Sequence, residues 1–399
     1  MADPGRGAPD AQDSEAMSAI DFEQAEERFE RSRDLTVGIE EEFALLDPLS
    51  LDLVPRFEAL RDAAREGDPA LHEHITGELI SSEIEIVSGR SESLAEALTR
   101  QRDRRRRLFA LCEAHETALG ASGTHPWADY RAQRIIDTPH YRRVEADLKY
   151  VAWRNNTFSL HVHVGVRSLE RAVAVCDRLR PVLPLLLAIS ASSPFLDGRD
   201  SGLHSARTQS FTRSFPRCGI PEAFGSWAAY RSYLEFLLRT SSIIEFTQVW
   251  WSVRPHLDFG TVEVRICDAQ CTAGESEALA ALILACVAQA ARDHDEGVPC
   301  VAPPGRLIEE NLWRAIRYGL DGKMIDLERA SEYPAREAIE RLLAWSEPVR
   351  SELDIQPSFP ERNGAQRQRA LIEAGATPAE AFAEIVKETQ RTYAEGVRA

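Results

Sequence analysis

The chain has 399 residues, of which 44% are hydrophobic and 28% charged, and this composition excludes a collagen-like, coiled-coil or wholly disordered protein. Asp and Glu number 64 against 47 Lys and Arg, which gives a net charge of −17. A surface of this sign repels phosphate backbones and anionic lipids, so we expect no nucleic acid and no membrane as a partner. The strongly apolar stretch over residues 182–189 is too short to span a bilayer.

The cysteines and the N-terminus indicate a reducing compartment. Seven cysteines, an odd number, are scattered along a chain far larger than those that need disulfides for stability. The N-terminus is acidic and lacks the apolar core of a secretion signal. These features predict a cytoplasmic protein.

Composition divides the chain into three parts. Residues 1–34 carry ten acidic and four basic residues, which predicts a disordered acidic tail. Residues 35–302 contain the strand and long helix patterns, and residues 303–399 are mostly helical in pattern, so we expect them to pack on the preceding domain. Helical surfaces outside the central domain are compatible with a homo-oligomer.

Four short segments alternate with a period of two, which is typical of half-buried strands. They are residues 36–45, 80–87, 160–166 and 261–268. Helical patterns over 91–119, 169–190, 224–238 and 275–294 separate them. Parallel strands covered on both faces would read as continuous apolar runs, so the alternation predicts an α+β protein with an antiparallel sheet and helices on one face.

The polar face of these strands has an unusual composition, without lysine. It carries Glu40, Glu42, Glu83, Glu85, His161, His163, Glu263 and Arg265. A solvated strand face is the ordinary explanation for any one of these residues, but four strands with the same bias favour a common site. Carboxylates on neighbouring strands would lie close together and repel one another unless a cation neutralises them. Oxygen ligands favour Mg²⁺, with Mn²⁺ as the alternative.

Other motifs indicate less. No Cys or Asp at zinc spacing accompanies His161 and His163, and no P-loop, dinucleotide fingerprint or G-x-S-x-G elbow occurs in the sequence. We interpret the arginine run over residues 100–107 as a solvated helix face.

Seven motifs in this order resemble the carboxylate-amine ligases of the glutamate-cysteine ligase type 2 family, from about Leu35 to beyond Arg367. They are Gly38-Ile-Glu-Glu-Glu-Phe43, Glu78-Leu-Ile-Ser-Ser-Glu-Ile-Glu85, Ala121-Ser-Gly-Thr-His-Pro126, Leu160-His-Val-His-Val-Gly165, Trp251-Ser-Val-Arg-Pro255, Gly260-Thr-Val-Glu-Val-Arg265 and Asn311-Leu-Trp-Arg-Ala315. The resemblance implies a glutamine-synthetase-like catalytic fold, in which a curved antiparallel sheet forms a funnel for ATP, metal ions and an amino acid.

The resemblance also implies roles for individual residues. The metal ligands fall on Glu40, Glu42, Glu78, Glu85, His161 and Glu263. Arg265 and Arg254 correspond to arginines that bind substrate or phosphate, so that they and Glu263 form the catalytic set, and Arg314 joins the two arginines as a nucleotide-binding candidate. Glu78 and Glu85 are seven positions apart and would face opposite ways in one strand, which predicts a break near Ser81 and Ser82.

The implied activity is an ATP-dependent ligation of the side-chain carboxylate of glutamate, or of a similar amino acid, to an amine such as cysteine through an acyl phosphate. Three alternatives stay open: another small-amine acceptor, a metal-dependent amidohydrolase using the same carboxylates, and a binding protein on a ligase scaffold. In each case the expected partners are small molecules.

Overall fold

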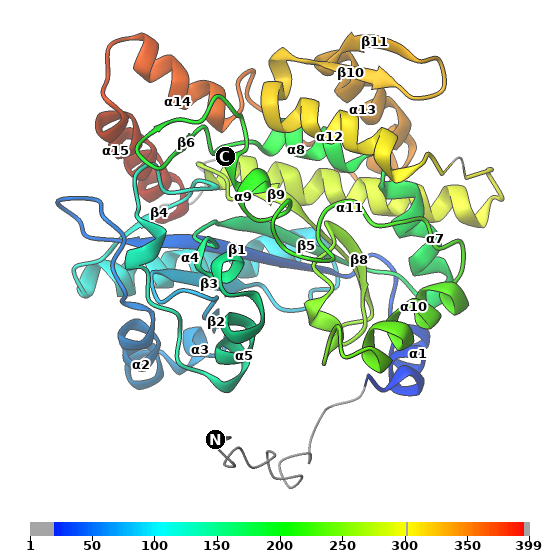
Figure 1. The fold of residues 1–399 in the computed structure, drawn as a ribbon, viewed down its shortest axis with the longest axis horizontal. Helices are drawn as coiled ribbons and strands as arrows, with labels where there is room; N and C mark the ends of the chain where they lie inside the picture. The colour runs from blue at the N-terminus through cyan, green and yellow to red at the C-terminus, as the bar shows by residue number, and fades with distance from the viewer. Residues whose placement is uncertain (1–19, 301, 395–399) are drawn as a thin grey trace, which may run out of the picture.

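A computed structural model describes residues 20–300 and 302–394 of the chain. Its centre is a seven-stranded sheet in the order β2-β3-β1-β5-β9-β8, with β4 paired to β1, and all of these pairs are antiparallel (Figure 1). The strands are β1 Val37–Leu46, β2 Ile75–Thr76, β3 Glu83–Val87, β4 Ala118–Gly120, β5 Ser159–Gly165, β8 Val253–His256 and β9 Thr261–Asp268. The prediction of an α+β protein with an antiparallel sheet is confirmed.

Long helices and short elements connect these strands. The helices are α1 Phe22–Arg31, α2 Phe57–Gly67, α3 Pro69–His72, α4 Leu94–Ala114, α5 Pro139–Leu148, α6 Tyr150–Trp153, α7 Leu169–Leu179, α8 Leu183–Ser190, α9 Ala206–Ser210, α10 Trp227–Arg239 and α11 Ala273–Asp295. Two short 3₁₀ turns, Tyr130–Ala132 and Phe246–Gln248, and a small hairpin of β6 Phe195–Leu196 and β7 Arg199–Asp200 complete this part. The predicted helix over 169–190 is divided into α7 and α8.

Helices α7, α8 and α11 pack on β5, β8 and β9, while α4 packs on β1 and β3. Alternation turns Val162, Val164, Val262 and Val264 toward these helices, and all four are fully buried in one core cluster. Within the described residues, α11 is the one helix long and apolar enough to cross a membrane, but 94% of its most apolar window is buried inside the fold. It is therefore the central core helix.

A buried ion pair joins α4 to the helix-covered face of the sheet. The side chain of Arg105 is 1% exposed and donates through Nε to Glu41, 2.7 Å away, and through Nη1 to Glu277, also 2.7 Å away. The interpretation of the 100–107 run as a solvated face is therefore wrong for Arg105, because Glu41 points into the core from β1 and needs a charged partner there.

The C-terminal region contains α12 Gly305–Tyr318, a 3₁₀ turn Gly319–Asp321, a hairpin of β10 Lys323–Asp326 and β11 Ser331–Pro334, α13 Ala335–Glu352, α14 Gly364–Glu373, α15 Pro378–Thr389 and a π-helical turn Gln390–Ala394. Helix α12 packs on α8, and α13 packs on α11. The Tyr393 ring contacts Phe43 of β1 at 5.1 Å and Phe109 of α4 at 6.0 Å between centroids. This region thus shares its core with the sheet domain.

Part of the predicted disordered tail is an ordered helix. Residues 1–19 lie outside the described residues, but Phe22–Arg31 forms α1, which begins at the N-cap Asp21 and buries Ala25 and Phe29 in the main core. The prediction of disorder up to residue 34 is therefore wrong for this helix. The segment is rich in charged residues, so little in the sequence indicated the two apolar residues, Ala25 and Phe29, that attach α1 to the core.

Candidate active site

Strand register brings the predicted polar residues onto one face of the sheet. Across β1 and β5, Glu40 is opposite His161 and Gly38 is opposite His163. In the next pair, His163 is opposite Glu263, and Glu42 of β1 is opposite Glu85 of β3. Directly opposite residues in an antiparallel pair point to the same side. The side chains therefore converge, although they come from widely separated parts of the chain.

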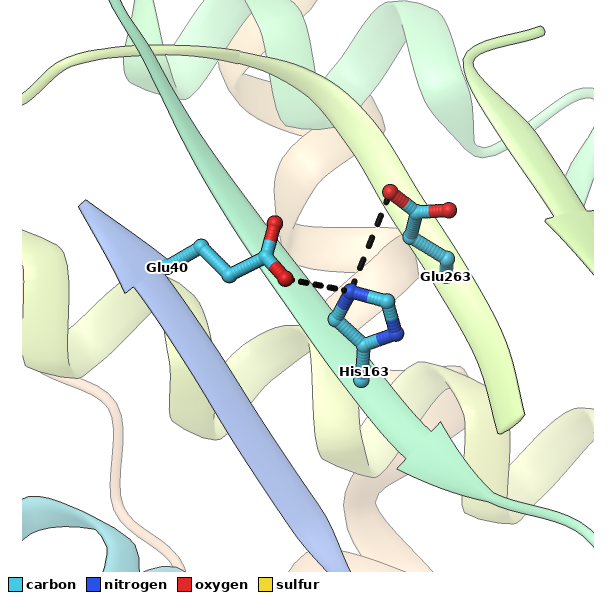
Figure 2. Close-up of side chains that lie close together, drawn as sticks. All are labelled: Glu40, His163 and Glu263. Atoms are coloured by element: carbon cyan, nitrogen blue, oxygen red, sulfur yellow. Dashed lines mark ion pairs between the residues drawn. The ribbon is translucent and has the colours of Figure 1, made fainter. Parts of the chain in front are cut away.

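Glu40, His163 and Glu263 form one group (Figure 2). His163 Nε2 lies 3.1 Å from Glu40 Oε1 and 3.8 Å from Glu263 Oε1, yet this buried nitrogen makes no hydrogen bond of acceptable geometry in the described chain. The other ring nitrogen, Nδ1, is 3.0 Å from Thr261 Oγ1. A histidine held through Nδ1 with Nε2 directed at two carboxylates has the arrangement of a metal ligand.

Two further groups adjoin the first, namely Glu40 with Glu85 and His161, and Glu42 with Glu78 and Glu85. In each group the potential ligand atoms lie within 4.8 Å of one another. Glu78 reaches its group because the chain leaves strand geometry between β2 and β3, with a turn at Ser81 and Ser82. The predicted break at these serines is confirmed.

The carboxyl groups next to β3 strongly resist ionisation. Burial raises the pKa of Glu78 to about 8, and the Glu42 charge adds to this effect. Burial also raises the pKa of Glu83 and of Glu85 well above the usual range, with Glu42 and Glu40, respectively, as the main charged neighbours. A cation among these carboxylates would favour their ionised form.

The other end of the face carries compensating positive charge. Burial alone would raise the pKa of Glu263, but Arg254 and Arg265 hold it well below the usual range. Arg254 Nε donates to Glu263 Oε2 at 2.6 Å, and Arg265 Nη1 donates to Glu263 Oε1. Similarly, His163 and His161 outweigh burial at Glu40 and hold its pKa well below the usual range.

The donors fit divalent cations with a preference for oxygen ligands. The three groups supply five different glutamates, two from β1 and one each from β3, the loop before it and β9, together with two imidazoles. Mg²⁺ and Mn²⁺ are bound by such carboxylate-rich sets, whereas zinc sites are usually closed by thiolates or several histidines. The orphaned Nε2 of His163 supports the same interpretation.

Two cavities flank the three groups. One, of about 460 Å³, is lined by Glu40, Glu85, His163 and the ring of Phe259. The other, of about 220 Å³, is lined by the acidic residues Glu42, Glu78 and Glu83, by polar residues and by three arginines, Arg207, Arg254 and Arg265. A larger cavity of about 880 Å³ lies between α4 and α11 and is lined by no member of the three groups. The first two cavities are therefore the candidate substrate sites.

One predicted site residue lies elsewhere. Arg314 is on α12, where its guanidinium is 2.7 Å from Glu332 Oε1 and donates to the Lys323 carbonyl at 3.2 Å. It lines neither of the two cavities. We therefore correct its assignment as a nucleotide-binding residue: it attaches α12 to the β10–β11 hairpin.

Three further residues line these cavities, and no pattern in the sequence indicated them. Arg207 comes from the short helix α9, and Tyr141 from α5, neither of which shows strand alternation. Phe259 lies in the β8–β9 turn, is 58% exposed and stacks on His256 with 4.2 Å between ring centroids. A large exposed aromatic residue between two strands is the one signal that could have indicated a ligand surface.

Comparison with known sequences identifies the family of this chain. The family model described as glutamate-cysteine ligase family 2 matches residues 36–397. A protein of Solibacter usitatus named "Putative glutamate--cysteine ligase 2" is 39% identical over 349 residues, which cover 86% of this chain and 90% of that protein. A Rubrobacter xylanophilus protein named "Putative glutamate--cysteine ligase 2-2" is 39% identical over 357 residues, covering 89% and 91%.

Solved structures support the fold at much lower sequence identity. The glutamate–cysteine ligase of Francisella tularensis, solved in complex with AMP, has a TM-score of 0.65 at 11% identity and covers 91% of this chain and 89% of its own. A bifunctional glutathione synthetase of Pasteurella multocida has a TM-score of 0.66 at 14% identity, covering 93% and 54%. The predicted glutamine-synthetase-like ligase fold is confirmed.

Proposed function

Because this chain belongs to the glutamate-cysteine ligase family 2, we propose that it joins the side-chain carboxylate of glutamate to the amine of cysteine or a similar acceptor. The protein is an ATP-dependent carboxylate–amine ligase. One observation carries the proposal: the three groups of Glu and His side chains converge between two cavities, one with a mostly apolar lining and one with a charged lining.

The chemistry explains why these parts are needed. A carboxylate is a poor acyl donor because its leaving group would be oxide. Transfer of the terminal phosphoryl group of ATP gives an acyl phosphate, from which the amine displaces phosphate. Phosphoryl transfer depends mainly on in-line positioning and on neutralisation of charge.

Each cavity suits one substrate. The 460 Å³ cavity has a mostly apolar lining with Phe259 at its edge, which suits a nucleotide base stacked on an aromatic ring. The 220 Å³ cavity combines carboxylates with three arginines, which suits a small zwitterionic amino acid. The three groups of Glu and His side chains lie between the two cavities, where the phosphoryl group would be transferred.

Roles follow for the chain's own residues. Glu40, Glu42, Glu78, Glu85, Glu263 and the two histidines would hold Mg²⁺ or Mn²⁺, which neutralises phosphate charge when bound. Arg265 lines the 220 Å³ cavity, and its guanidinium would bind the acyl or phosphate oxygens. Arg254 fixes Glu263. Glu83 lines this cavity and belongs to none of the three groups. Burial and the Glu42 charge raise the pKa of its carboxyl, so it would accept the proton of the attacking amine only in the ionised form that a cation bound among its neighbours favours.

The compartment follows from cysteine chemistry. All seven cysteines are unpaired in the structure, and five of them are buried. Free thiols of this number persist where the medium is reducing, so we place the reaction in the cytoplasm.

The test is ADP formation with Mg²⁺, L-glutamate and a panel of amines, with the product identified by mass. We expect Glu42→Gln and Glu263→Gln to lose Mg²⁺-dependent ADP formation by at least about 100-fold while remaining folded, since each removes a ligand and a charge from a site that must neutralise phosphate. Glu73→Gln, an exposed glutamate beyond the site, serves as the matched control. Near-normal turnover in both site variants would refute the proposal. Hydrolysis of an amide in the absence of ATP would favour an amidohydrolase.

A further inference from the structure

The turn between β8 and β9, residues 257–260, carries Phe259, which lines the 460 Å³ cavity. The backbone N–H groups of Phe259 and Gly260 both donate to the His256 carbonyl, at 3.2 and 3.0 Å, and these bonds close the turn. The Phe259 ring stacks on the His256 ring with an angle of 7° between their planes, and Phe259 is 58% exposed. The protein therefore supports one face of this ring, and the place of the other face depends on where the turn lies.

Helix α1 holds this turn by the carbonyl groups at its two ends. Arg28 Nη1 donates to the Leu257 carbonyl at 2.8 Å, and Ser32 Oγ donates to the Gly260 carbonyl at 2.7 Å. Leu257 and Gly260 are the first and the last residue of the turn, so the two bonds fix the ends between which Phe259 projects. The donors precede the turn by 229 and 228 positions, and their contact with it is therefore purely tertiary.

The helix and the turn also approach each other closely at Gly260. This residue has a φ of +67°, in the left-handed region that favours glycine. A Cβ atom here would lie 3.3 Å from the Arg28 carbonyl oxygen and 3.3 Å from Ser32 Cβ, which is tighter than an ordinary van der Waals contact. The turn therefore rests directly on the end of α1, with no side chain of its own between them.

Contacts other than those to the turn hold α1 in place. Phe29 is fully buried in the main hydrophobic core. Glu26 accepts a hydrogen bond from Trp227 Nε1 at 2.8 Å. Truncation of Arg28 or Ser32 should therefore free the turn without displacing the helix from the core.

We propose that Arg28 and Ser32 are positioning residues for the nucleotide: they hold the turn so that the ring of Phe259 is in place before ATP binds. This inference rests on the proposed function, which assigns the 460 Å³ cavity to the nucleotide. Neither Arg28 nor Ser32 lines that cavity, so each acts only through the turn. A turn that has to be ordered when the ligand binds lowers the affinity, whereas a turn already held in place does not.

Calorimetric binding of a nucleotide tests this role without turnover. A non-hydrolysable ATP analogue is titrated with Mg²⁺ into the wild type, Arg28→Ala, Ser32→Ala and the double variant. We expect each single variant to bind the analogue about 5- to 10-fold more weakly, and the double variant at least about 20-fold more weakly, because the lost hydrogen bonds preorganise the site. Wild-type affinity in the double variant would overturn the inference.

Three controls separate positioning of the turn from a general effect on the fold. L-Glutamate, titrated into protein saturated with the analogue, should bind every variant as it binds the wild type, and equal weakening of both ligands would show that Arg28 and Ser32 only support the fold. Arg28→Lys keeps a donor for the Leu257 carbonyl and should bind the analogue within about 2-fold of the wild type. Arg31→Ala removes an exposed arginine of the same helix, which pairs with Glu27, and should leave both affinities unchanged.

A double-mutant cycle tests whether the helix acts through Phe259. Phe259→Ala should weaken binding of the analogue about 10-fold, because the base loses its stacking partner. Addition of Arg28→Ala to Phe259→Ala should then cost less than about 2-fold, since the ring that Arg28 positions is no longer there. An undiminished cost of Arg28→Ala in this background would show that Arg28 does not act through the ring, and would overturn the inference.

Failure of this inference is distinguishable from failure of the proposed ligase. If the wild type forms no ADP with any amine but binds the analogue, and the Arg28 and Ser32 variants lose that binding, the ligase proposal fails and the positioning role stands. If ADP forms with glutamate and an amine while the double variant binds the analogue as the wild type does, the ligase stands and α1 has no such role.

Discussion

Replacement of Glu78 by Gln should change stability and metal binding in opposite directions. The carboxyl group of Glu78 lies with those of Glu42 and Glu85, and burial together with the Glu42 charge raises its pKa to about 8. A folded-state pKa above the unfolded value of 4.5 means that the folded protein holds this proton more tightly. The resulting stability is fully present below pH 4.5 and is lost as the pH rises toward 8.

The magnitude follows from the two pKa values. At pH 7.5 the loss for this group is about 4 kcal/mol relative to the protonated state, and at pH 5.5 it is about 1 kcal/mol, since each pH unit is worth roughly 1.4 kcal/mol. Glu78 is half-buried, so water screening makes these figures upper limits and about 2 kcal/mol is a realistic gain at pH 7.5. Glutamine is neutral at both pH values, so the variant should lack this pH dependence.

Urea denaturation in EDTA at pH 5.5 and 7.5 measures the effect. We expect Glu78→Gln to be more stable than the wild type at pH 7.5 and the difference to shrink by about half or more at pH 5.5. With Mg²⁺ added, the wild type should gain stability by mass action and the variant much less, because it has lost a ligand. Glu73→Gln, at an exposed site, should match the wild type throughout. A destabilised Glu78→Gln in EDTA, or equal Mg²⁺ stabilisation, would refute the repulsion argument.

Two further predictions concern stability away from the site. Burial lowers the pKa of His125 to about 4, and its Nε2 lies 2.7 Å from the Leu51 carbonyl while Nδ1 accepts from Ala128 N, so the neutral ring is required. The stability that neutral His125 contributes is present above pH 6.5 and is lost as the pH falls toward 4. Between pH 7.5 and 5.5 the free energy of unfolding should therefore fall by about 1 kcal/mol more in the wild type than in His125→Gln, as measured by urea denaturation, and parallel profiles would contradict this. Arg105→Met should lower the free energy of unfolding by about 3–5 kcal/mol, because Glu41 would lose its buried partner. The exposed Arg106→Ala should cost at most about 0.5 kcal/mol, and a similarly small effect of Arg105→Met would show that the pair is not needed.

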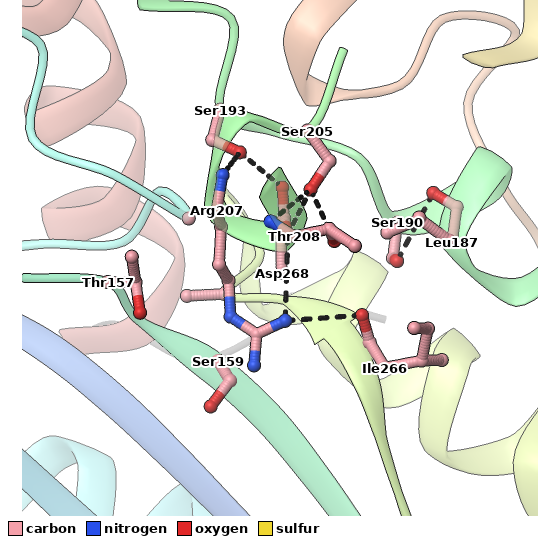
Figure 3. A network of polar contacts seen from close by, with 12 residues as sticks. Thr157, Ser159, Leu187, Ser190, Ser193, Ser205, Arg207, Thr208, Ile266 and Asp268 are labelled. Carbon is pink, nitrogen blue, oxygen red and sulfur yellow. Dashed lines mark hydrogen bonds and ion pairs between the residues drawn. The ribbon is translucent and has the colours of Figure 1, made fainter. Parts of the chain in front are cut away.

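Several features of the site could not be read from the pattern of residues. Arg105 and Arg106 are adjacent in one basic run, and only the position of α4 on β1 makes the first buried and the second exposed. Arg207 lies in a five-residue helix without periodicity, so its place beside the cavity depends on tertiary contacts such as the hydrogen bond from its backbone N–H to Ser193 Oγ (Figure 3). Arg314 is the opposite case: the motif assigned it to the site, but in the structure it pairs with Glu332 of the β10–β11 hairpin.

What the sequence by itself determined is the sheet and its two faces. Period-two alternation in β1, β5 and β9 has a single physical solution, in which valines and isoleucines meet helices and Glu, His and Arg share the opposite side. Only the tertiary structure decided which of those polar residues meet. Strand order and register set the distance between His163 and Glu263, the approach of Glu78 to Glu42, and the two cavities on either side. Order and register in turn arise from contacts between distant segments rather than from local preference.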